Sequence, residues 1–307
     1  MNNAMLFHTL SGAALIAAFP IYFAQAATLN VDCDAGTAIA GIYATVRPGD
    51  TVLVSGTCKE QVSIPPELTR VTFDGQKKAT IQHPGGQQAS PHAFYNRGKE
   101  ITIKNFTVTG GQDGIHLSGP ASAVIDGNLV TKNSGRGIHI DKGSIARILN
   151  TTVEHSGSIG IDVTGASYAY IGVFIPRVQA LHPNIIRNNG GPGINIERTS
   201  GAWIVGNTIS GNKESGITVH RNAQADVIAN VISGNGGDAI NVSYNSGVNF
   251  DSEPRKDGPN QTAAGQKNAG AAIRCAIGGY VDGPLGSLAG ARSAKDFDKN
   301  CVDRVTQ

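Results

Sequence analysis

A Gly-Ile step recurs through the middle of the chain and constrains the fold more than any other feature. Its first residue is Gly114, Gly137, Gly160, Gly193 or Gly216, and in the last copy Ala239. Every interval is 23 residues except one of 33. Two apolar columns keep the same spacing, one two places after the isoleucine and one seven places before the glycine. A repeat of this length predicts a supersecondary unit that buries its apolar face only by stacking on its neighbours.

The local pattern within each repeat indicates strands. Short alternating runs of apolar and polar residues, such as residues 137–141, are separated by Asn, Gly and Ser. A period of two is typical of β-strands, whereas helical repeats need longer apolar segments and tolerate few glycines. We therefore predict regular β-coils over residues 101–243, with a loop insertion at residues 172–183 that accounts for the long interval.

Asparagines recur at two places of the repeat. One column contains Asn105, Asn128, Asn184, Asn207 and Asn230, with Thr151 in the remaining place; the other contains Asn133, Asn189, Asn212 and Asn235, with Gly110 and Ser156. We interpret these as turn positions, where asparagine adopts the left-handed backbone region and its amide bonds to the amide one coil above.

The order of Asn, an apolar residue, Asn, Gly and Gly-Ile resembles the right-handed parallel β-helix proteins of the pectate-lyase-like superfamily, over roughly residues 40–250. This resemblance implies an all-β chain that forms a single-stranded right-handed parallel β-helix, or solenoid, with capped ends. It also implies a polysaccharide as the substrate class.

The two ends of the chain differ from the regular coils. Residues 1–26 are typical of a secretory signal peptide, because an apolar run over residues 10–23 ends in Ala24-Gln25-Ala26. A membrane anchor is the alternative, but the run is shorter than the roughly 20 apolar residues of a spanning helix. We therefore expect a secreted or periplasmic chain with no membrane span after signal removal.

Residues 27–100 are predicted to form the N-terminal cap and the first coils. Short strands are expected near residues 52–54, 62–64, 71–73 and 80–82, with a short helix within residues 38–44 that covers the end of the core. Residues 244–307 are predicted to form a C-terminal cap preceded by an extended tail along the outside of the stack.

Four cysteines form two local pairs, Cys33 with Cys58 and Cys275 with Cys301. An even number of cysteines in an exported chain indicates two disulfides, with three connectivities open. We favour pairing between neighbours, because each bridge would close a terminal segment that has a coil on only one side.

Charge excludes two classes of partner. The net charge of +2 and the charged fraction of 16% are too low for a nucleic-acid-binding surface or for attraction to an acidic membrane. The oligomeric state is not predicted by any feature of the sequence.

Ionisable residues gather on one predicted face. Alternate side chains of a β-coil point outward, and equivalent places on successive coils lie about 4.8 Å apart. The residue after each Gly-Ile step therefore forms an outward row of His116, His139, Asp162, Asn195, Thr218 and Asn241. A second row contains Ser118, Asp141, Thr164, Glu197, His220 and Ser243, and beside it lie Lys142, Arg198, Arg221 and Tyr244.

Lyase chemistry on a uronic-acid polymer requires a base near the C5 proton and a cation that holds the adjacent carboxylate. We expect His139 to be the base, with Asp141 or Asp162 fixing its ring, and Arg198 and Arg221 to bind the carboxylate.

The remaining candidates complete the predicted site. Glu197 and His220 join the catalytic set, and the substrate-binding set is His116, Lys142, Asn195 and Tyr244. No cofactor is predicted, although the oxygen ligands of Asp141, Asp162 and Glu197 would also suit calcium.

Two functions fit these residues. The favoured one is an exported lyase-type enzyme acting on acidic (uronate) polysaccharide; the alternative is a non-catalytic exported β-helix that binds a glycan or a cell-surface partner. The outward face of any soluble β-helix is polar, so such residues also accumulate without a function. The insertion at residues 172–183 would form one wall of a cleft, cover a sheet edge or dock a second copy.

Overall fold

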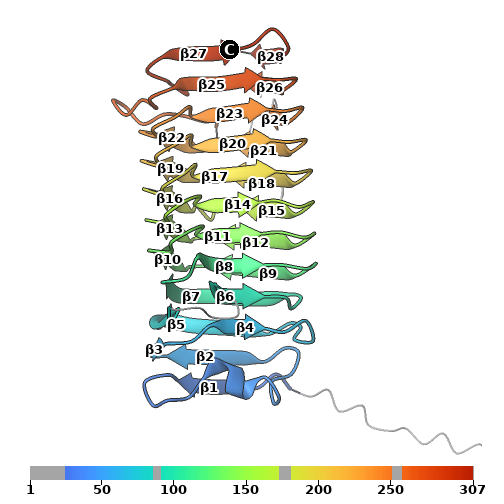
Figure 1. Ribbon diagram of the computed structural model, residues 1–307, viewed down its shortest axis with the longest axis vertical. Helices are drawn as coiled ribbons and strands as arrows, with labels where there is room; N and C mark the ends of the chain where they lie inside the picture. Colours follow the sequence, from blue (N-terminus) through green and yellow to red (C-terminus); the bar gives the residue numbers. More distant parts are fainter. Residues whose placement is uncertain (1–24, 86–90, 173–180, 251–257, 307) are drawn as a thin grey trace, which may run out of the picture.

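The computed structural model describes residues 25–85, 91–172, 181–250 and 258–306. The chain winds into a column of stacked coils, from the N-terminal coil at the bottom of Figure 1 to the C-terminal coil at the top. This arrangement confirms the predicted all-β solenoid. The predicted signal peptide lies outside the described residues except for its last two. In the described part of the chain, no helix has the length and apolar character needed to span a membrane.

The strands form two sheets. The 10-stranded sheet contains β4 (Val62–Ile64), β6 (His92–Asn96), β8 (Asp113–Leu117), β11 (Ile138–Ile140), β14 (Ile161–Val163), β17 (Ile194–Glu197), β20 (Ile217–His220), β23 (Ile240–Ser243), β25 (Ala271–Ala276) and β27 (Ser293–Phe297). The 18-stranded sheet contains β1 (Thr28–Asp32), β2 (Thr51–Ser55), β3 (Thr57–Cys58), β5 (Thr72–Gln82), β7 (Ile101–Thr109), β9 (Ser122–Asp126), β10 (Leu129–Thr131), β12 (Ile145–Leu149), β13 (Thr152–Glu154), β15 (Tyr168–Ile171), β16 (Ile185–Arg187), β18 (Gly201–Val205), β19 (Thr208–Ser210), β21 (Gln224–Ile228), β22 (Val231–Ser233), β24 (Gly247–Asn249), β26 (Tyr280–Pro284) and β28 (Val302–Thr306).

The 18-stranded sheet consists of two ladders that join at β5 and β7. Both strands are long enough to take part in both ladders, and their register shifts between Asp74 and Ala79. The segments expected as two strands near residues 71–73 and 80–82 therefore form the single strand β5. A regular coil has one strand in each of three parallel ladders, as β11, β12 and β13 pair with β14, β15 and β16.

The apolar columns line one continuous core along the axis. The isoleucines of the Gly-Ile steps are fully buried, and so are the apolar residues seven places before the glycines. Burying each such side chain stabilises the stack by about 1.5–3 kcal/mol relative to leaving it exposed. The inward direction of these residues is the prediction on which the outward rows depend, and it is confirmed.

The asparagine columns form side-chain amide ladders. Nδ2 of Asn207 donates to Oδ1 of Asn230 at 3.0 Å, and Nδ2 of Asn230 donates to Oδ1 of Asn260 at the same distance. Each Oδ1 also accepts the backbone N–H of the residue one coil before, as Asn230 does from Asn207 at 2.9 Å. The predicted bonding between coils is therefore confirmed.

The left-handed turn residues are not the ladder asparagines, which corrects the sequence interpretation. Positive φ angles occur at the residue before most ladder positions, for example 56° at Ala229 and 55° at Lys132, whereas a proline precedes Asn184 and Asn260. Asn105, with a φ of 61°, belongs to this preceding position, and Phe106 takes the ladder place by donating its N–H to Asn128.

Both ends carry the features expected of small closures. A 3₁₀ helix over Ile39–Ile42 buries Ile39 at the N-terminal end of the core. The predicted disulfides Cys33–Cys58 and Cys275–Cys301 are both formed.

The stack continues past residue 243, whereas the sequence predicted an extended tail along its outside. β24 pairs with β21, and β25 to β28 add further rungs. Asn260 and Asn268 are buried and continue the two amide ladders. They follow Asn230 and Asn235 by 30 and 33 residues, so an alignment based on 23-residue intervals did not detect them.

Candidate active site

The strand register confirms the first outward row. His116 on β8, His139 on β11 and Asp162 on β14 are direct partners in successive strands. Asn195 and Thr218 extend the row along β17 and β20. Side chains of adjacent coils therefore meet at the spacing of about 4.8 Å that separates paired strands.

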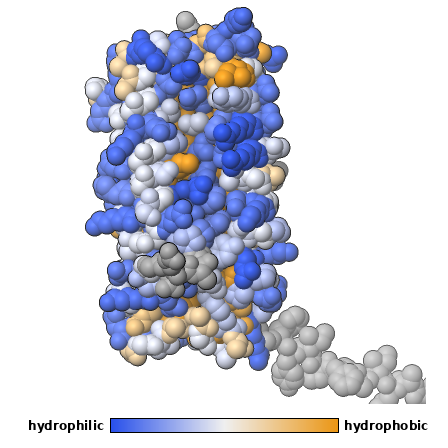
Figure 2. All heavy atoms as spheres, viewed as in Figure 1, coloured by the Kyte–Doolittle hydropathy of each residue, from blue (hydrophilic) through white to orange (hydrophobic). Residues whose placement is uncertain are grey.

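Two polar groups form on this sheet. We call the first the histidine cluster: His92, Asp113, His116, Arg136, His139, Asp141 and Asp162, from β6, β8, β11, β14 and adjoining turns. We call the second the Glu197 group: Thr164, Glu197, Arg198, His220 and Arg221, from the end of β14, β17 and β20. The face of the column seen in Figure 2 is mostly hydrophilic, with only small apolar patches.

Asp113 is the centre of the histidine cluster. Its Oδ2 lies 3.2 Å from Nδ1 of His139 and 3.2 Å from Nδ1 of His92, and its side chain is 2% exposed. Burial would raise the pKa of Asp113, but the contacts with His139 and His92 outweigh burial and lower this pKa well below its usual range. Asp113, and not the predicted Asp141 or Asp162, therefore fixes the ring of His139.

His116 stacks on His139, with ring centroids 4.3 Å apart and planes 15° from parallel. Its Nδ1 lies 2.9 Å from Nε2 of His92, and its Nε2 lies 3.2 Å from Oδ1 of Asp141. Burial lowers the pKa of His116. Burial would raise the pKa of Asp141, but contacts with His116 and Ser118 lower it to about 2. The cluster therefore sets a His116 ring whose neutral form is favoured beside the ionised carboxylates of Asp113 and Asp141.

Asp162 has partners other than His139. Nε of Arg136 lies 2.8 Å from its Oδ2, and Nδ2 of Asn195 donates to its Oδ1 at 2.8 Å. Burial raises the pKa of Asp162 despite these partners. Nε2 of His139 is 3.7 Å away, which is beyond hydrogen-bond distance.

The histidine cluster is closed to a large substrate. The side chains of His116 and His139 are 8% and 9% exposed, and Nε2 of each ring is buried without a hydrogen-bond partner. A polysaccharide cannot reach Nε2 of His139 in this arrangement, because side chains of successive coils cover one another. The geometry therefore disfavours His139 as the base and His116 and Asn195 as substrate contacts.

Glu197 holds the second group together. Its Oε2 lies 2.6 Å from Nη1 of Arg221 and 3.2 Å from Nε2 of His220. Its Oε1 lies 3.0 Å from Nη1 of Arg198 and accepts the hydroxyl of Thr164 at 3.3 Å. The carboxylate, whose side chain is 10% exposed, therefore positions three basic side chains.

The basic side chains of the Glu197 group are open to solvent. Arg198 and Arg221 are 60% and 52% exposed, and His220 is 20% exposed. Burial lowers the pKa of His220, and the nearby Glu197 offsets part of this effect. A neutral imidazole beside two exposed guanidiniums has the components needed to remove a proton next to a carboxylate.

Lys142 and Tyr244 lie in the same turn position as the two arginines. All four residues have positive φ angles, from 52° at Lys142 to 59° at Arg221. The turns of Lys142 and Tyr244 follow β11 and β23, and both side chains are exposed. These predicted substrate contacts therefore extend the exposed edge of the Glu197 group in both directions along the column.

Sequence reasoning missed His92, Asp113 and Arg136 as members of a site. His92 lies on β6, before the first Gly-Ile step, and pairs with Asp113 only 21 positions later. Asp113 and Arg136 precede the glycine, where strict alternation would point a side chain inward. A Cβ on Gly137 would instead meet the interior residue Val153, so glycine and isoleucine both face the core and alternation fails at this step.

The carboxylates suggested as calcium ligands do not converge. Asp141 contacts His116, Asp162 contacts Arg136, and Glu197 holds its own basic partners. Among the described residues, the groups with metal-binding atoms close together on this sheet are His92–Asp113–His116 and His116–His139–Asp141. Nitrogen-rich groups of this kind suit transition metals better than calcium.

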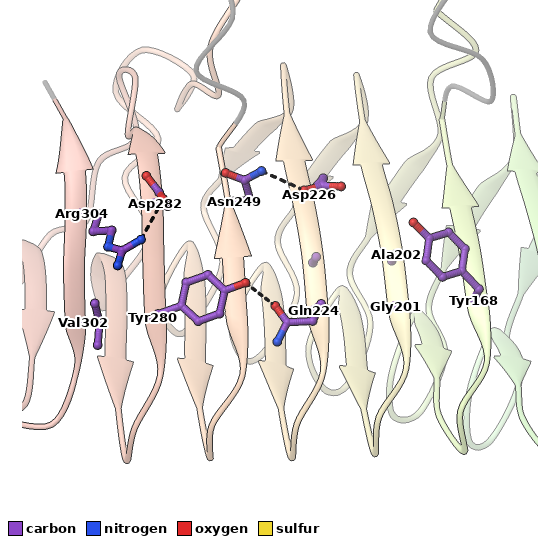
Figure 3. Close-up of a pocket in the computed structure, with 11 residues that line it drawn as sticks. Tyr168, Gly201, Ala202, Gln224, Asp226, Asn249, Tyr280, Asp282, Val302 and Arg304 are labelled. Carbon is purple, nitrogen blue, oxygen red and sulfur yellow. Dashed lines mark hydrogen bonds and ion pairs between the residues drawn. The ribbon is translucent and has the colours of Figure 1, made fainter.

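A groove of about 750 Å³ lies on a different face, across the ladder that contains β15, β18, β21, β24, β26 and β28. Tyr168 stands at one end, Tyr280 lies nearer the other end, where Val302 and Arg304 of β28 follow, and the two rings lean toward each other (Figure 3). A Cβ on Gly201 would lie 2.7 Å from the Tyr168 ring, and one on Gly247 would overlap the Tyr280 ring. The glycines therefore let both rings lie flat on the sheet. None of the predicted site residues lines this groove.

Residues 173–180 of the predicted insertion lie outside the described residues. Of its last residues, Leu181 is 38% exposed and packs near Gly206 on the column.

Comparison with known proteins supports the fold assignment. The model of the right handed beta helix region matches residues 92–253. A comparison with curated proteins found no match. The chain is similar to the solved structure of pectate lyase Pel9A, with 12% identity, a TM-score of 0.53, and coverage of 91% of this chain and 79% of that chain.

It is also similar to a double mutant of the periplasmic alginate epimerase AlgG, with 14% identity, a TM-score of 0.51, and coverage of 91% of this chain and 73% of that chain. At these identities the two similarities show the fold alone. The family model covers more than half of the chain, and the stacked parallel coils agree with it. The chain therefore belongs to the right-handed β-helix family.

Proposed function

We propose that this chain is an exported lyase-type enzyme that acts on an acidic, uronate-containing polysaccharide, with the Glu197 group as its active site. The observation that carries this proposal is the buried carboxylate of Glu197, which holds His220 beside the exposed guanidiniums of Arg198 and Arg221. The names of the proteins with the same fold add support, since pectate and alginate are uronate polymers. The two disulfides fit an oxidising compartment outside the cytosol.

The proposed step is a β-elimination with His220 as the base. The carboxylate 3.2 Å from Nε2 favours a proton on that nitrogen and leaves the lone pair of Nδ1 to accept the C5 proton. The C4–O bond then breaks, a C4–C5 double bond forms, and the leaving oxygen takes a proton from water. Arg198 and Arg221 pair with the substrate carboxylate and stabilise the negative charge that develops as C5 loses its proton.

The exposed turn edge is suited to a long anionic chain. Arg198, Arg221 and Tyr244 follow one another on successive coils, and Lys142 lies on the same edge two coils before Arg198. Neighbouring coils are about 4.8 Å apart. Several uronate units can therefore contact the edge at once, which would place the scissile bond beside His220.

A screen of pectate, alginate and glycosaminoglycans that follows the ultraviolet absorbance of new unsaturated ends tests the proposal. His220→Gln should lower the rate by about 10²–10⁴-fold on the active polymer, which is the usual contribution of a general base. His139→Gln is the matched comparison on the same sheet. The assignment is overturned if no polymer yields unsaturated ends, or if His139→Gln abolishes activity while His220→Gln retains it.

The groove of Figure 3 favours a second candidate function, the binding of a glycan without catalysis. The flat rings of Tyr168 and Tyr280 provide apolar platforms for sugar rings, and Gln224, Asp226 and Asn249 between them provide polar groups. The hydroxyl of Tyr280 donates to Oε1 of Gln224 at 2.6 Å, which fixes its ring. A tyrosine over a glycine also stabilises a sheet by itself, so binding must be measured directly.

Charge distinguishes the two surfaces. Asp226 and Asp282 outnumber Arg304 in the groove, so it favours an uncharged glycan over a uronate. Calorimetric titration with neutral oligosaccharides should show binding that weakens about tenfold or more in Tyr280→Ala, as for a central aromatic contact. Tyr280→Phe should keep most of the affinity. Ile145→Ala, an exposed apolar residue in the row of Tyr168, is the control. Equal affinities in all variants would exclude the groove as the glycan-binding site.

A further inference from the structure

Three buried polar atoms of the histidine cluster lie close together, and none of them makes a well-aligned hydrogen bond. They are Nε2 of His116, Nε2 of His139 and Oδ1 of Asp141. These three residues each provide one ligand atom, all within 4.8 Å of one another, and Nε2 of His116 lies 3.2 Å from Oδ1 of Asp141. Buried polar groups in native proteins are normally paired. A shared cation would satisfy all three atoms at once.

The surrounding contacts leave a lone pair on Nε2 of His139 and allow one on Nε2 of His116. The carboxylate of Asp113 can only accept, so it favours protons on Nδ1 of His139 and on Nδ1 of His92, each 3.2 Å away. Nε2 of His92 is then an acceptor, and Nδ1 of His116, 2.9 Å away, donates to it. In His139 the proton is therefore on Nδ1 and Nε2 is free to bind a cation. In His116 the same network allows the proton on Nδ1, and a cation between Nε2 and Oδ1 of Asp141 would replace the proton that otherwise joins these two atoms.

This pattern is the one that orients histidine ligands in metalloproteins. A metal-binding histidine usually donates its other N–H to a carboxylate or another acceptor, which fixes the tautomer and the ring direction. Asp113 supplies that acceptor directly to His139, and it does so through His92 to His116. Asp113 is 2% exposed, so this outer shell is held rigidly inside the stack.

We propose that His116, His139 and Asp141 bind a divalent transition metal ion, with zinc as the preferred ion. Two imidazole nitrogens and one carboxylate oxygen are a common zinc ligand set, whereas calcium takes six or more oxygens. Tetrahedral zinc with bonds of about 2.0–2.1 Å separates its ligands by about 3.3 Å, close to the 3.2 Å between His116 and Asp141. The site is distinct from the Glu197 group and does not depend on the proposed lyase function.

Zinc titration of untagged, chelator-treated protein by calorimetry tests this proposal. The wild-type chain should bind one zinc ion and unfold at a higher temperature with zinc than without it. His139→Gln and Asp141→Asn should each weaken binding at least tenfold. His155→Gln is the matched control, because His155 is a histidine on the same column whose side chain is 52% exposed and which lies outside the cluster. It should bind zinc as the wild type does.

Two further measurements keep the result interpretable. Unfolding midpoints without metal show whether the variants are folded. If they are not, the visible absorption of wild-type protein loaded with Co²⁺ decides. Nitrogen and oxygen ligands in a four-coordinate site give a distinctive Co²⁺ spectrum. His220→Gln should leave zinc affinity unchanged, which separates this site from the lyase proposal. The zinc-site proposal is overturned by any of three results: no stoichiometric zinc binding, binding of calcium alone, or equal zinc affinity in the wild type and Asp141→Asn.

Discussion

Glu197 and Arg221 come from adjacent coils, and Nη1 of the arginine lies 2.6 Å from Oε2 of the glutamate. The carboxylate is nearly buried, whereas about half of the arginine side chain is exposed. The ion pair therefore anchors a cation whose remaining N–H groups reach solvent. Arg198 is placed in the same way by the other carboxylate oxygen.

Replacing Arg221 by glutamine should reduce kcat/KM on the active uronate polymer by about 100-fold or more, as expected when a donor that stabilises developing charge is removed. The charge on the substrate carboxylate would then be matched by Arg198 alone. Arg187→Gln is the control, because Arg187 is also exposed and paired with a glutamate, Glu154, but lies on another ladder. Equal losses in both variants would show that general electrostatics, and not this position, matters.

Removing the charge of Glu197 should lower the pKa of His220 further. Burial already lowers this pKa below 6.5, and the negative charge of Glu197 opposes the shift. Glu197→Gln removes the larger of the two acidic charges that oppose burial and the arginines, leaving only Asp162, so the protonated ring becomes less favourable. NMR titration of the His220 ring measures the shift. A midpoint above 6.5 in the wild type, or a midpoint that rises in Glu197→Gln, contradicts this prediction.

The same shift sets a direction for stability. Because the folded-state pKa of His220 lies below the unfolded value near 6.5, the unfolded chain binds a proton first as the pH falls. The contribution of His220 to stability is therefore fully present above pH 6.5 and decreases as the pH falls from 6.5 toward the folded-state pKa. Urea unfolding measures this contribution. Within this pH range the stability of the wild type should fall more steeply with decreasing pH than that of His220→Gln, and outside it the two should show the same pH dependence.

The fold was predictable because the sequence repeat and the stacked coils have the same physical cause. Each Gly-Ile isoleucine must fill the same place in the core of its coil, so its spacing reports the coil length directly. The 23-residue spacing did not identify Asn260 and Asn268 because their coils are longer, although both residues occupy the same ladders. An insertion that lengthens a coil breaks the sequence spacing, but the asparagine amide of that coil still joins the ladder.

The site was less predictable from the sequence. Which side chains of neighbouring coils meet depends on the strand register, and the number of residues between them does not fix it. The sequence predicts that Asp141, just past the end of its strand, or Asp162, in its row, holds His139, yet Nδ1 of His139 contacts Asp113 of the preceding coil. The sequence also could not show that stacking closes His139 while leaving Arg198 open. Outward direction is a local property, whereas exposure depends on the size of the side chains one coil above and below.

Asn207→Ala should destabilise the column by about 3 kcal/mol or more, since each buried group left unpaired costs about 1–3 kcal/mol. Nδ2 of Asn207 donates to Asn230 and to the carbonyl of Ile171, and its Oδ1 accepts from Asn184. Urea unfolding followed by circular dichroism measures the change. The control is Asn249→Ala, an exposed asparagine that should lose no more than about 0.5 kcal/mol. Similar losses in both would mean that the ladder adds little.

Gly137→Ala tests why the repeat keeps its glycine. A Cβ at this position would lie 2.7 Å from the carbonyl oxygen of Gly160 and closer still to Cγ1 of Val153. Both atoms belong to the packed wall between coils, so neither can move freely, and we expect a loss of about 1–3 kcal/mol from overpacking. Gly41→Ala is the control, because no atom lies within 4 Å of a Cβ there. If Gly137→Ala unfolds at the same urea concentration as Gly41→Ala, the close approach of coils does not explain the glycine.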